Sequence, residues 1–595
     1  MTGHTRESTI LSLTDTVVLE SEDSSQPILL LTAGDKASPP ATTDEATLPD
    51  TPPKSYSPFN NSKPLPVRKE ETLDSRMVPP TIPPEHSNRT LIVCFDGTGD
   101  QFDCDNSNIV QFFSLLKKDD KSKQMVYYQA GIGTYTSPQV ATPLMSKLVK
   151  TLDEMVALHL DAHVMGGYEF LMQNYVAGDR ICIFGFSRGA YTARSLAGMI
   201  HKVGLLPADN WQQVPFAYKM YTRTDQVGWE QSNAFKRAFS VDVTIEFVGV
   251  WDTVDSVGLV PKRLPFTTSN TILRTFRHAV SLDERRAKFK ANLWNRPTAE
   301  EAVLGASATH LPPNHSSRDS PRSSPDSKKK EKQDMKKGHR PSESPLHWLD
   351  EDERDLADNE GRYSAHIANA KPTDIEEVWF AGCHCDVGGG SVSNDTRHSL
   401  SRISLRWMIR ECFKTNTGIM FDSQKLREIG LDPTSLYPFV TPRPPRLSGQ
   451  TSRIQTAASP RKPLLQGLVS KVLRRDSNYK ELPVADVKTN PVGRLTEEEE
   501  ELHDAMAPIY DQLEIAKTWW ILELIPMQFR YQKGSNEWVS WFGMNLARPR
   551  FIPKQKKNGV KVHRSVKTRM EASHEGDGKK YLPRAYFSIE PTWVD

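Results

Sequence analysis

The sequence predicts an α/β fold in which helices cover both faces of a mostly parallel β-sheet. Two observations support this prediction. Short, uniformly apolar segments alternate along the chain with segments of helical periodicity, which is typical of parallel strands buried on both faces. One apolar segment also leads through a glycine-flanked serine directly into a helical segment, at residues 179–200. A parallel sheet with crossover helices accommodates such a connection.

The expected elements follow one another in a simple order. Uniformly apolar runs predict strands at residues 89–95, 125–129, 179–184, 244–250 and 377–381. Apolar residues at helical spacing predict helices at 110–116, 153–175 and 188–204, and again across 498–520. The stretch around His278 is rich in arginine and is expected to be helical.

Composition divides the 595 residues into apolar and polar parts. The expected parts are a disordered tail at 1–86, a catalytic domain at 87–430 with a disordered Lys-rich insertion at 310–346, a basic linker at 440–492 and a C-terminal region at 493–595. The tail, insertion and linker lack the apolar content that a packed core needs. The C-terminal region is expected to pack on the core, because Trp519, Trp520, Trp538 and Trp541 require burial.

The bulk composition excludes several classes of protein. The formal net charge is +2, so nucleic-acid binding is not expected. Six cysteines without paired metal-ligand spacing indicate neither a disulfide scaffold nor a zinc site. The first residues lack a basic segment leading into an apolar one, and no apolar run is long enough to span a bilayer. We therefore expect a cytoplasmic protein, either free or peripheral to a membrane.

The most specific local signal is Gly185-Phe186-Ser187-Arg188-Gly189, between an expected strand and an expected helix. This G-x-S-x-G arrangement is typical of the nucleophile elbow of α/β-hydrolases, in which a sharp turn lifts the serine hydroxyl above the sheet. The two glycines lack β-carbons, which lets the strand and the helix close around the turn. The alternative is a tight turn whose serine only caps the helix. The strand and helix context favours Ser187 as a nucleophile.

A serine nucleophile needs a base, and the base needs an orienting carboxylate. In α/β-hydrolases the chain order is serine, acid, histidine. Asp252 follows the fourth expected strand and is the preferred acid, with Asp255 as the fallback. His384 follows the last expected strand and is the preferred base, with His278 as its rival. The predicted catalytic residues are therefore Ser187, Asp252 and His384.

An oxyanion hole combines the backbone N–H of the residue after the nucleophile with an N–H from an earlier loop. We expect these donors to be Arg188 and either Gly97 or Thr98, because the latter two follow the first strand. The same loop allows a second interpretation, a phosphatase with Asp96 as nucleophile. That class carries a metal-binding aspartate where this chain has Cys94, which disfavours it.

Six motifs follow one another along the chain. They are FDGTGD at 95–100, YYQAGIGTY at 127–135, GFSRGAYTAR at 185–194, VWDTVDSVG at 250–258, FRHAVSLDERR at 276–286 and EVWFAGCHCDVGGG at 377–390. Together they resemble the α/β-hydrolase domain of the type VI secretion phospholipase effectors, a family with fungal members of unknown role. The resemblance covers roughly residues 89–415. It implies a Ser–Asp–His triad at Ser187, Asp252 and His384, and phospholipase A-type cleavage of acyl esters.

The sequence thus predicts a serine esterase or lipase that cleaves acyl esters, with a lipid or phospholipid as the expected substrate. A basic amphipathic pattern at 462–475 is compatible with a helix at an anionic membrane surface, but a helix docked on the protein or an accidental pattern in a disordered segment is favoured. No cofactor and no metal are expected, because the acidic run at 100–105 lacks the spacing of a calcium loop and predicts a solvated turn. The alternative is a catalytically silent scaffold of the same fold that recruits partners through its polar segments.

Overall fold

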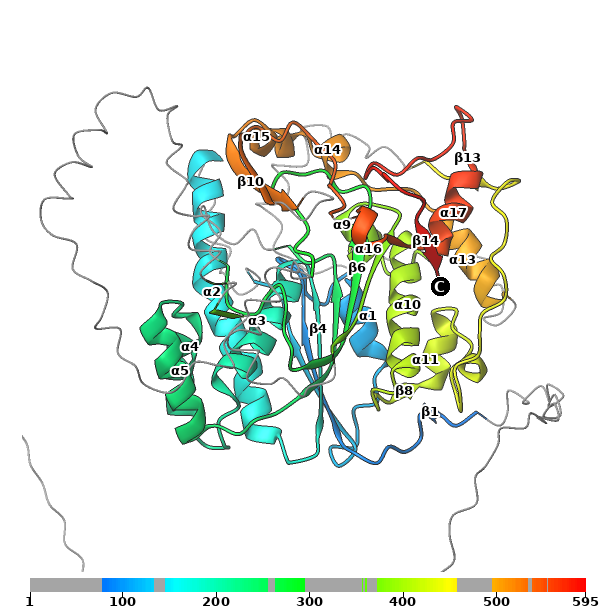
Figure 1. Ribbon diagram of the computed structural model, residues 1–595. Helices are drawn as coiled ribbons and strands as arrows, with labels where there is room; N and C mark the ends of the chain where they lie inside the picture. The colour runs from blue at the N-terminus through cyan, green and yellow to red at the C-terminus, as the bar shows by residue number, and fades with distance from the viewer. Residues whose placement is uncertain are drawn as a thin grey trace, which may run out of the picture. The chain divides into compact units, whose positions relative to one another are not determined.

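The computed structural model describes residues 78–132, 145–254, 263–294, 356, 359–360, 372–456, 495–532, 538–553 and 555–595. Five predictions concern residues outside these ranges, wholly or in part: the tail up to residue 77, the insertion at 310–346, the linker from residue 457 onward, the amphipathic pattern at 462–475 and the fallback acid Asp255. Figure 1 colours the described chain from blue near its N-terminus to red at its C-terminus.

Eight parallel strands form the central sheet, in the spatial order β14-β12-β7-β6-β5-β4-β2-β3. They are β2 (Thr90–Phe95), β3 (Gln124–Gln129), β4 (Arg180–Phe186), β5 (Ile245–Trp251), β6 (Leu273–Ser281), β7 (Asp374–Phe380), β12 (Lys561–His563) and β14 (Thr592–Val594). Every residue of β2 is buried. Leu91, Val93 and Phe95 join one apolar core, and Ile92 and Cys94 join the other. Burial on both faces explains why β2 is almost entirely apolar.

Helices cover the two faces of the sheet (Figure 1). One layer contains α2 (Met145–Asn174), α3 (Ser187–Val203), α4 (Val214–Thr222) and α5 (Gln226–Phe239), and the other contains α1 (Asn108–Leu115) and α10 (Leu400–Lys414). The short helices are α9 (His384–Gly388), α11 (Ser423–Glu428), α13 (Glu497–Ala505), α14 (Gln512–Ile515), α15 (Trp520–Glu523), α16 (Gln555–Asn558) and α17 (Arg564–Glu571), with 3-10 turns η2 (Trp211–Gln213), η4 (Pro433–Ser435) and η5 (Lys517–Trp519). Three strand pairs complete the described elements. Two are antiparallel, β1 (Thr81–Ile82) with β8 (Phe421–Asp422) and β10 (Met527–Gln532) with β11 (Trp538–Gly543), and one is parallel, β9 (Arg453–Ile454) with β13 (Ser573–His574).

The predicted fold class is confirmed, and each predicted strand matches a strand of the sheet. Two predictions of local structure are wrong. Residues 273–281 form strand β6 rather than a helix, and all of them except Arg274 are buried between β5 and β7. Their arginine content reflects an ion pair, since Arg277 lies 2.7 Å from Glu411 of α10. The pattern at 498–520 divides into α13, α14, η5 and α15, because Pro508 has no N–H to continue the first helix.

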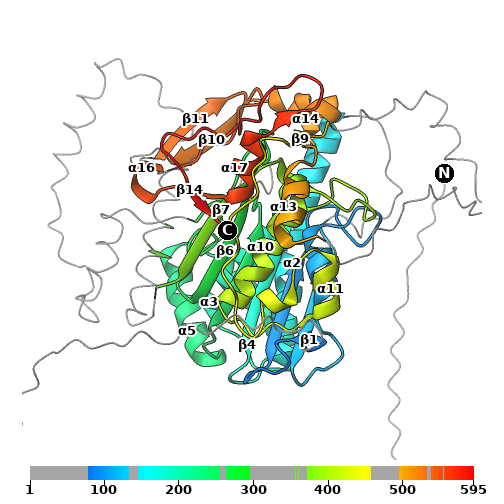
Figure 2. The same cartoon turned by 90° about the vertical axis from the view of Figure 1, so that its right-hand side faces the viewer.

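The C-terminal residues share the sheet with the rest of the chain. Strands β12 and β14 extend it beyond β7, and Figure 2 looks onto this edge, where the red C-terminal elements lie. The tryptophans follow the expectation only in part, because Trp519 is partly buried whereas Trp520 is 38% exposed. In the described ranges, no helix is both long enough and apolar enough to cross a bilayer.

Candidate functional site

The predicted site residues follow the carboxyl ends of neighbouring strands. Phe186, the last residue of β4, pairs with Trp251, the last residue of β5. The next residues along the chain, Ser187 and Asp252, therefore leave the sheet side by side. His384 follows β7, two strands further along the sheet. Because these strands are parallel, their carboxyl ends meet at one edge, where α/β proteins place their sites.

Ser187 occupies a sharp turn between β4 and α3. Its φ is +59°, in the left-handed region that costs energy for a residue with a β-carbon. A β-carbon on Gly185 would lie 2.5 Å from the Gly189 carbonyl oxygen, and one on Gly189 would lie 2.2 Å from the Asp96 carbonyl oxygen. The cap residue of α3 is Phe186, and no side chain caps the helix there. The turn thus has the geometry of a nucleophile elbow rather than that of a serine cap.

Asp252 and His384 are in direct contact. Oδ2 of Asp252 lies 2.5 Å from Nδ1 of His384, and the two side chains are 0% and 3% exposed. The Ser281 backbone N–H donates to the other carboxylate oxygen at 2.9 Å. Burial lowers the pKa of His384, so the ring is neutral near pH 7. Because an ionised carboxylate can only accept a hydrogen bond, we assign the ring proton to Nδ1, which leaves Nε2 as an acceptor.

The ring of His384 also packs against the elbow. It stacks on the ring of Phe186, the residue before Ser187, with centroids 4.7 Å apart. The edge of Phe289 contacts it from another side, at 4.9 Å. Within the part of the chain that the structure describes, Nε2 of His384 and the Ser187 hydroxyl make no direct hydrogen bond. A hydrogen bond between a serine and a histidine that exchange a proton often forms only once substrate is bound.

Both ring nitrogens of the rival base, His278, already have hydrogen-bond partners. Nε2 accepts from the Thr253 backbone N–H at 3.0 Å, and Nδ1 donates to Oε1 of Glu377 at 3.0 Å. Burial lowers the pKa of His278, which keeps this ring neutral. Since Thr253 directly follows Asp252, these bonds hold the loop that carries Asp252.

The two expected donors in the loop after β2 differ in their hydrogen bonds. The Gly97 N–H donates to Oδ1 of Asp96 at 2.8 Å. The Thr98 N–H has no acceptor among the described residues, and the Thr98 hydroxyl is buried without a partner. Asp96 also accepts from the hydroxyls of Ser107 at 2.6 Å and Tyr128 at 2.8 Å. Asp96 thus holds the loop in place, and Thr98 is the residue with an unused donor.

The sequence model of a protein family, the T6SS phospholipase effector Tle1-like catalytic domain, matches residues 89–411, just over half of the chain. The chain belongs to this family. The resemblance predicted from the six motifs is therefore confirmed, and it places the chain among phospholipase-type catalytic domains. An uncharacterized protein of Saccharomyces cerevisiae is 29% identical to this Tle1-like chain over 560 residues, which cover 82% of this chain and 80% of the yeast protein.

Two solved structures are similar to the Tle1-like chain. One is the crystal structure of an uncharacterized protein from Pseudomonas aeruginosa, with 17% identity and a TM-score of 0.27 over 56% of this chain. The other is a Tle1 effector bound to the VgrG spike of the type 6 secretion system, with 16% identity and a TM-score of 0.19 over 35% of this chain. The matches cover 46% and 48% of those two chains, so about half of their length is shared.

The Tle1-like site contains two ion pairs that sequence reasoning missed. Arg550 contacts both carboxylate oxygens of Asp252, with Nη2 2.9 Å from Oδ2. Glu284 accepts from the His384 backbone N–H at 3.2 Å and lies 2.8 Å from Arg286. The position of Glu284 and Arg286 just after a strand could have indicated a site. The sequence around Arg550 carries no comparable signal.

These ion pairs set the protonation of the site. Burial would raise the pKa of Asp252, but the charge of Arg550 and the hydrogen bond from His384 outweigh it and hold this pKa well below its ordinary value. Burial likewise opposes ionisation of Glu284, but the charge of Arg286 outweighs it and lowers the Glu284 pKa to about 2. Both carboxylates are therefore ionised beside a neutral imidazole, which is the charge state that a general base requires.

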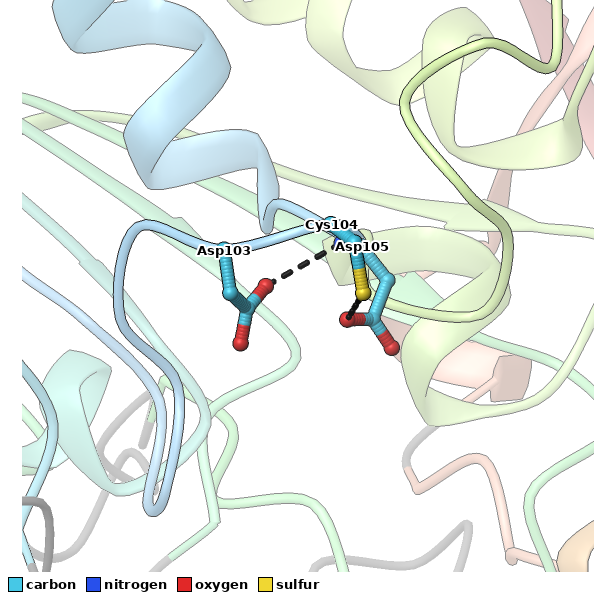
Figure 3. A group of neighbouring side chains, drawn as sticks. All are labelled: Asp103, Cys104 and Asp105. Carbon is cyan, nitrogen blue, oxygen red and sulfur yellow. Dashed lines mark hydrogen bonds between the residues drawn. The ribbon is translucent and has the colours of Figure 1, made fainter. Parts of the chain in front are cut away.

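An exposed acidic turn precedes α1, and Figure 3 shows its three side chains, Asp103, Cys104 and Asp105. Oδ1 of Asp103 accepts from the Asp105 N–H at 3.1 Å, and the Cys104 thiol lies 3.4 Å from Oδ1 of Asp105. The Asn394 side chain donates to the Asp103 carbonyl oxygen at 2.7 Å and accepts from the Asn106 N–H at 2.9 Å. These contacts shape the turn and tie it to the segment around Asn394.

Proposed function

We propose that this Tle1-like chain is a serine hydrolase that cleaves acyl esters of lipids or phospholipids. In this proposal Ser187 is the nucleophile, His384 the general base and Asp252 the orienting carboxylate. The observation that carries it is the 2.5 Å contact between His384 and Asp252, next to a strained elbow at Ser187. The chain order of serine, acid and histidine supports the same assignment.

In the proposed reaction, Nε2 of His384 accepts the Ser187 hydroxyl proton while Oγ attacks the ester carbonyl carbon. The oxyanion of the tetrahedral intermediate accepts hydrogen bonds from the backbone N–H groups of Arg188 and Thr98. The imidazolium then protonates the departing alcohol, which leaves an acyl ester on Ser187. Water, deprotonated by His384, attacks this ester, and the carboxylic acid departs as the serine regains its proton. Asp252 stays ionised and stabilises the imidazolium.

An exposed apolar face in the C-terminal region supports a lipid substrate. Its side chains, each at least 38% exposed, are Ile515, Trp520, Ile521, Leu524, Ile525, Phe542, Met544, Leu546 and Phe551. Large apolar side chains gathered in this way mark surfaces that bind proteins or membranes. Lys517 and Arg548 are exposed within the same segment, which favours an anionic lipid surface over a neutral one.

This apolar face is linked to the candidate site by short contacts. Buried Glu523 of α15 accepts from the Ala287 N–H at 2.6 Å and from the Ala547 N–H at 2.8 Å, which joins both parts of the face to the loop after β6. The rings of Trp519 and Phe289 are in edge contact with centroids 5.5 Å apart, and the rings of Phe289 and His384 are in edge contact with centroids 4.9 Å apart. Figures 1 and 2 both place α14 and β10 together at one end of the sheet. A lipid bound at the face would thus lie close to the imidazole.

The proposal is tested by labelling with a fluorophosphonate probe and by hydrolysis of phospholipid, neutral lipid and a short soluble ester. Ser187→Ala and His384→Ala are expected to abolish labelling, and Ser187→Ala to lower turnover by about 10⁶-fold, as in a well-studied triad. The matched control is Ser195→Ala, because Ser195 is buried in the same helix and its hydroxyl donates to the Tyr191 carbonyl oxygen. Folded wild-type protein that neither labels nor hydrolyses any ester would favour the silent scaffold instead.

A further inference from the structure

Arg550 reaches the candidate site from outside the family match, which ends at residue 411. Its guanidinium is 2% exposed and pairs with Asp252, which is 0% exposed. We propose that Arg550 is a positioning residue of the hydrolase, which fixes the plane and balances the charge of Asp252 so that His384 acts as a neutral base. This inference rests on the proposed function of the same site.

The guanidinium has an acceptor for each of its five N–H groups. Nη1 and Nη2 contact one carboxylate oxygen of Asp252 each. Nη1 also donates to the Ser281 hydroxyl oxygen at 2.7 Å. The Phe289 carbonyl oxygen accepts from Nε at 3.0 Å and from Nη2 as well. A two-pronged contact of this kind defines the plane of a carboxylate as well as its position. A lysine could supply the charge but not the plane.

The position of Asp252 is passed on to the imidazole. Oδ2 of Asp252 accepts from Arg550 and from His384, so the guanidinium and the ring share one oxygen. Phe289 provides a second link, because its carbonyl oxygen accepts from Arg550 while its ring contacts His384 at 4.9 Å. Loss of the guanidinium therefore frees both the carboxylate and the aromatic ring that hold His384 in place.

Arg550 also balances the charges around the imidazole. The charged side chains around the ring include Asp252, Glu284, Arg286 and Arg550, and Lys290 lies beside Glu284 and Arg550. The neighbouring thiols of Cys383 and Cys385 are neutral, because burial raises their pKa. Arg286 is paired with Glu284, and Arg550 is paired with Asp252. Without Arg550 one negative charge is uncompensated, which favours the imidazolium and moves the pKa of His384 upward.

The segment that carries Arg550 is fastened to the loop after β6. The Asn545 side chain donates to the Arg285 carbonyl oxygen at 2.8 Å, and the Lys290 ammonium donates to the Arg548 carbonyl oxygen at 3.1 Å. The same segment follows β11, whose hairpin with β10 belongs to the C-terminal region. The C-terminal region therefore completes the site of the Tle1-like domain instead of only covering it.

The test compares wild type, Arg550→Gln and Arg550→Lys by the pH dependence of kcat/KM on a short soluble ester. Arg550→Gln is expected to lower the maximal kcat/KM, the plateau of the pH profile, by about 10²-fold. It is also expected to move the acid limb, the rise in kcat/KM as His384 loses its proton, to higher pH by about one unit. Arg550→Lys keeps the charge, so its acid limb stays at the wild-type position while its plateau falls. The matched control is Arg406→Gln, which breaks an equally buried ion pair, 2.6 Å long, between α10 and Asp504 of α13.

The control is expected to lower the melting temperature without moving the acid limb. If Arg550→Gln leaves the limb in place, or Arg550→Lys matches wild type in both plateau and limb, Arg550 is only a structural ion pair and the inference is overturned. If Arg550→Gln does not fold, the lysine variant decides alone. Failure of the proposed function is recognised separately, since Ser187→Ala would then retain activity whatever Arg550 does.

Discussion

Replacing Gly189 by alanine tests the elbow geometry directly. The added β-carbon would lie 2.2 Å from the Asp96 carbonyl oxygen and 2.5 Å from the Phe95 carbonyl oxygen. Both are backbone atoms and cannot rotate away, whereas ordinary van der Waals contact begins near 3.4 Å. Helix α3 and the loop after β2 must therefore separate by about 1 Å, and a displacement of that size costs about 10²-fold in rate.

The displacement moves the two expected oxyanion donors apart, because Arg188 lies on α3 and Thr98 on the loop after β2. We expect Gly189→Ala to lower kcat on a short soluble ester by about 10²-fold, and to reduce stability by about 1–3 kcal/mol through overpacking. Circular dichroism and thermal unfolding measure the stability, and the fluorophosphonate reaction rate measures the reactivity of the serine.

The matched control is Gly166→Ala, within helix α2. There the nearest atom to an added β-carbon is the Tyr127 hydroxyl oxygen at 3.2 Å, at the free end of a side chain. Alanine also favours a helix by about 1 kcal/mol over glycine, so this variant is expected to keep wild-type activity. A folded Gly189→Ala protein with wild-type kcat would refute the argument that close packing of the elbow positions the site.

Two other substitutions separate structural from functional roles. His278→Leu leaves the buried Thr253 N–H without its acceptor, which is expected to cost about 1–3 kcal/mol, while Glu377 keeps the Trp294 N–H as a partner; folded protein should still label with the fluorophosphonate probe, and loss of labelling at full stability would instead make His278 a base. Leu524→Glu combined with Phe542→Glu places two charges on the apolar face, and we expect lost co-sedimentation with anionic phospholipid vesicles but unchanged hydrolysis of a short soluble ester. Unchanged vesicle binding would rule out this face as the membrane contact.

The elbow could be predicted because its determinants are local. Ser187 and its flanking glycines lie within five residues, and an apolar strand precedes them. Asp252 and His384 are far apart in the chain, and only the rule that parallel strands end at one edge of the sheet predicts that they meet. The helix expected around His278 was wrong, because periodicity cannot distinguish a fully buried strand from a buried helix. The sheet neighbours of β6 decide that case.

The linear chain by itself determined the parallel sheet, the elbow and the order of the three candidate catalytic residues, since strand composition, glycine spacing and chain order are properties of short segments. Only the tertiary structure decided that His384 rather than His278 contacts Asp252, and that the backbone N–H of Thr98 rather than that of Gly97 lacks an acceptor among the described residues. It also decided that Arg550 pairs with Asp252, 298 residues away in the chain. Those outcomes depend on hydrogen-bond partners brought together by packing, and a buried carboxylate does not indicate in the sequence where its cation lies.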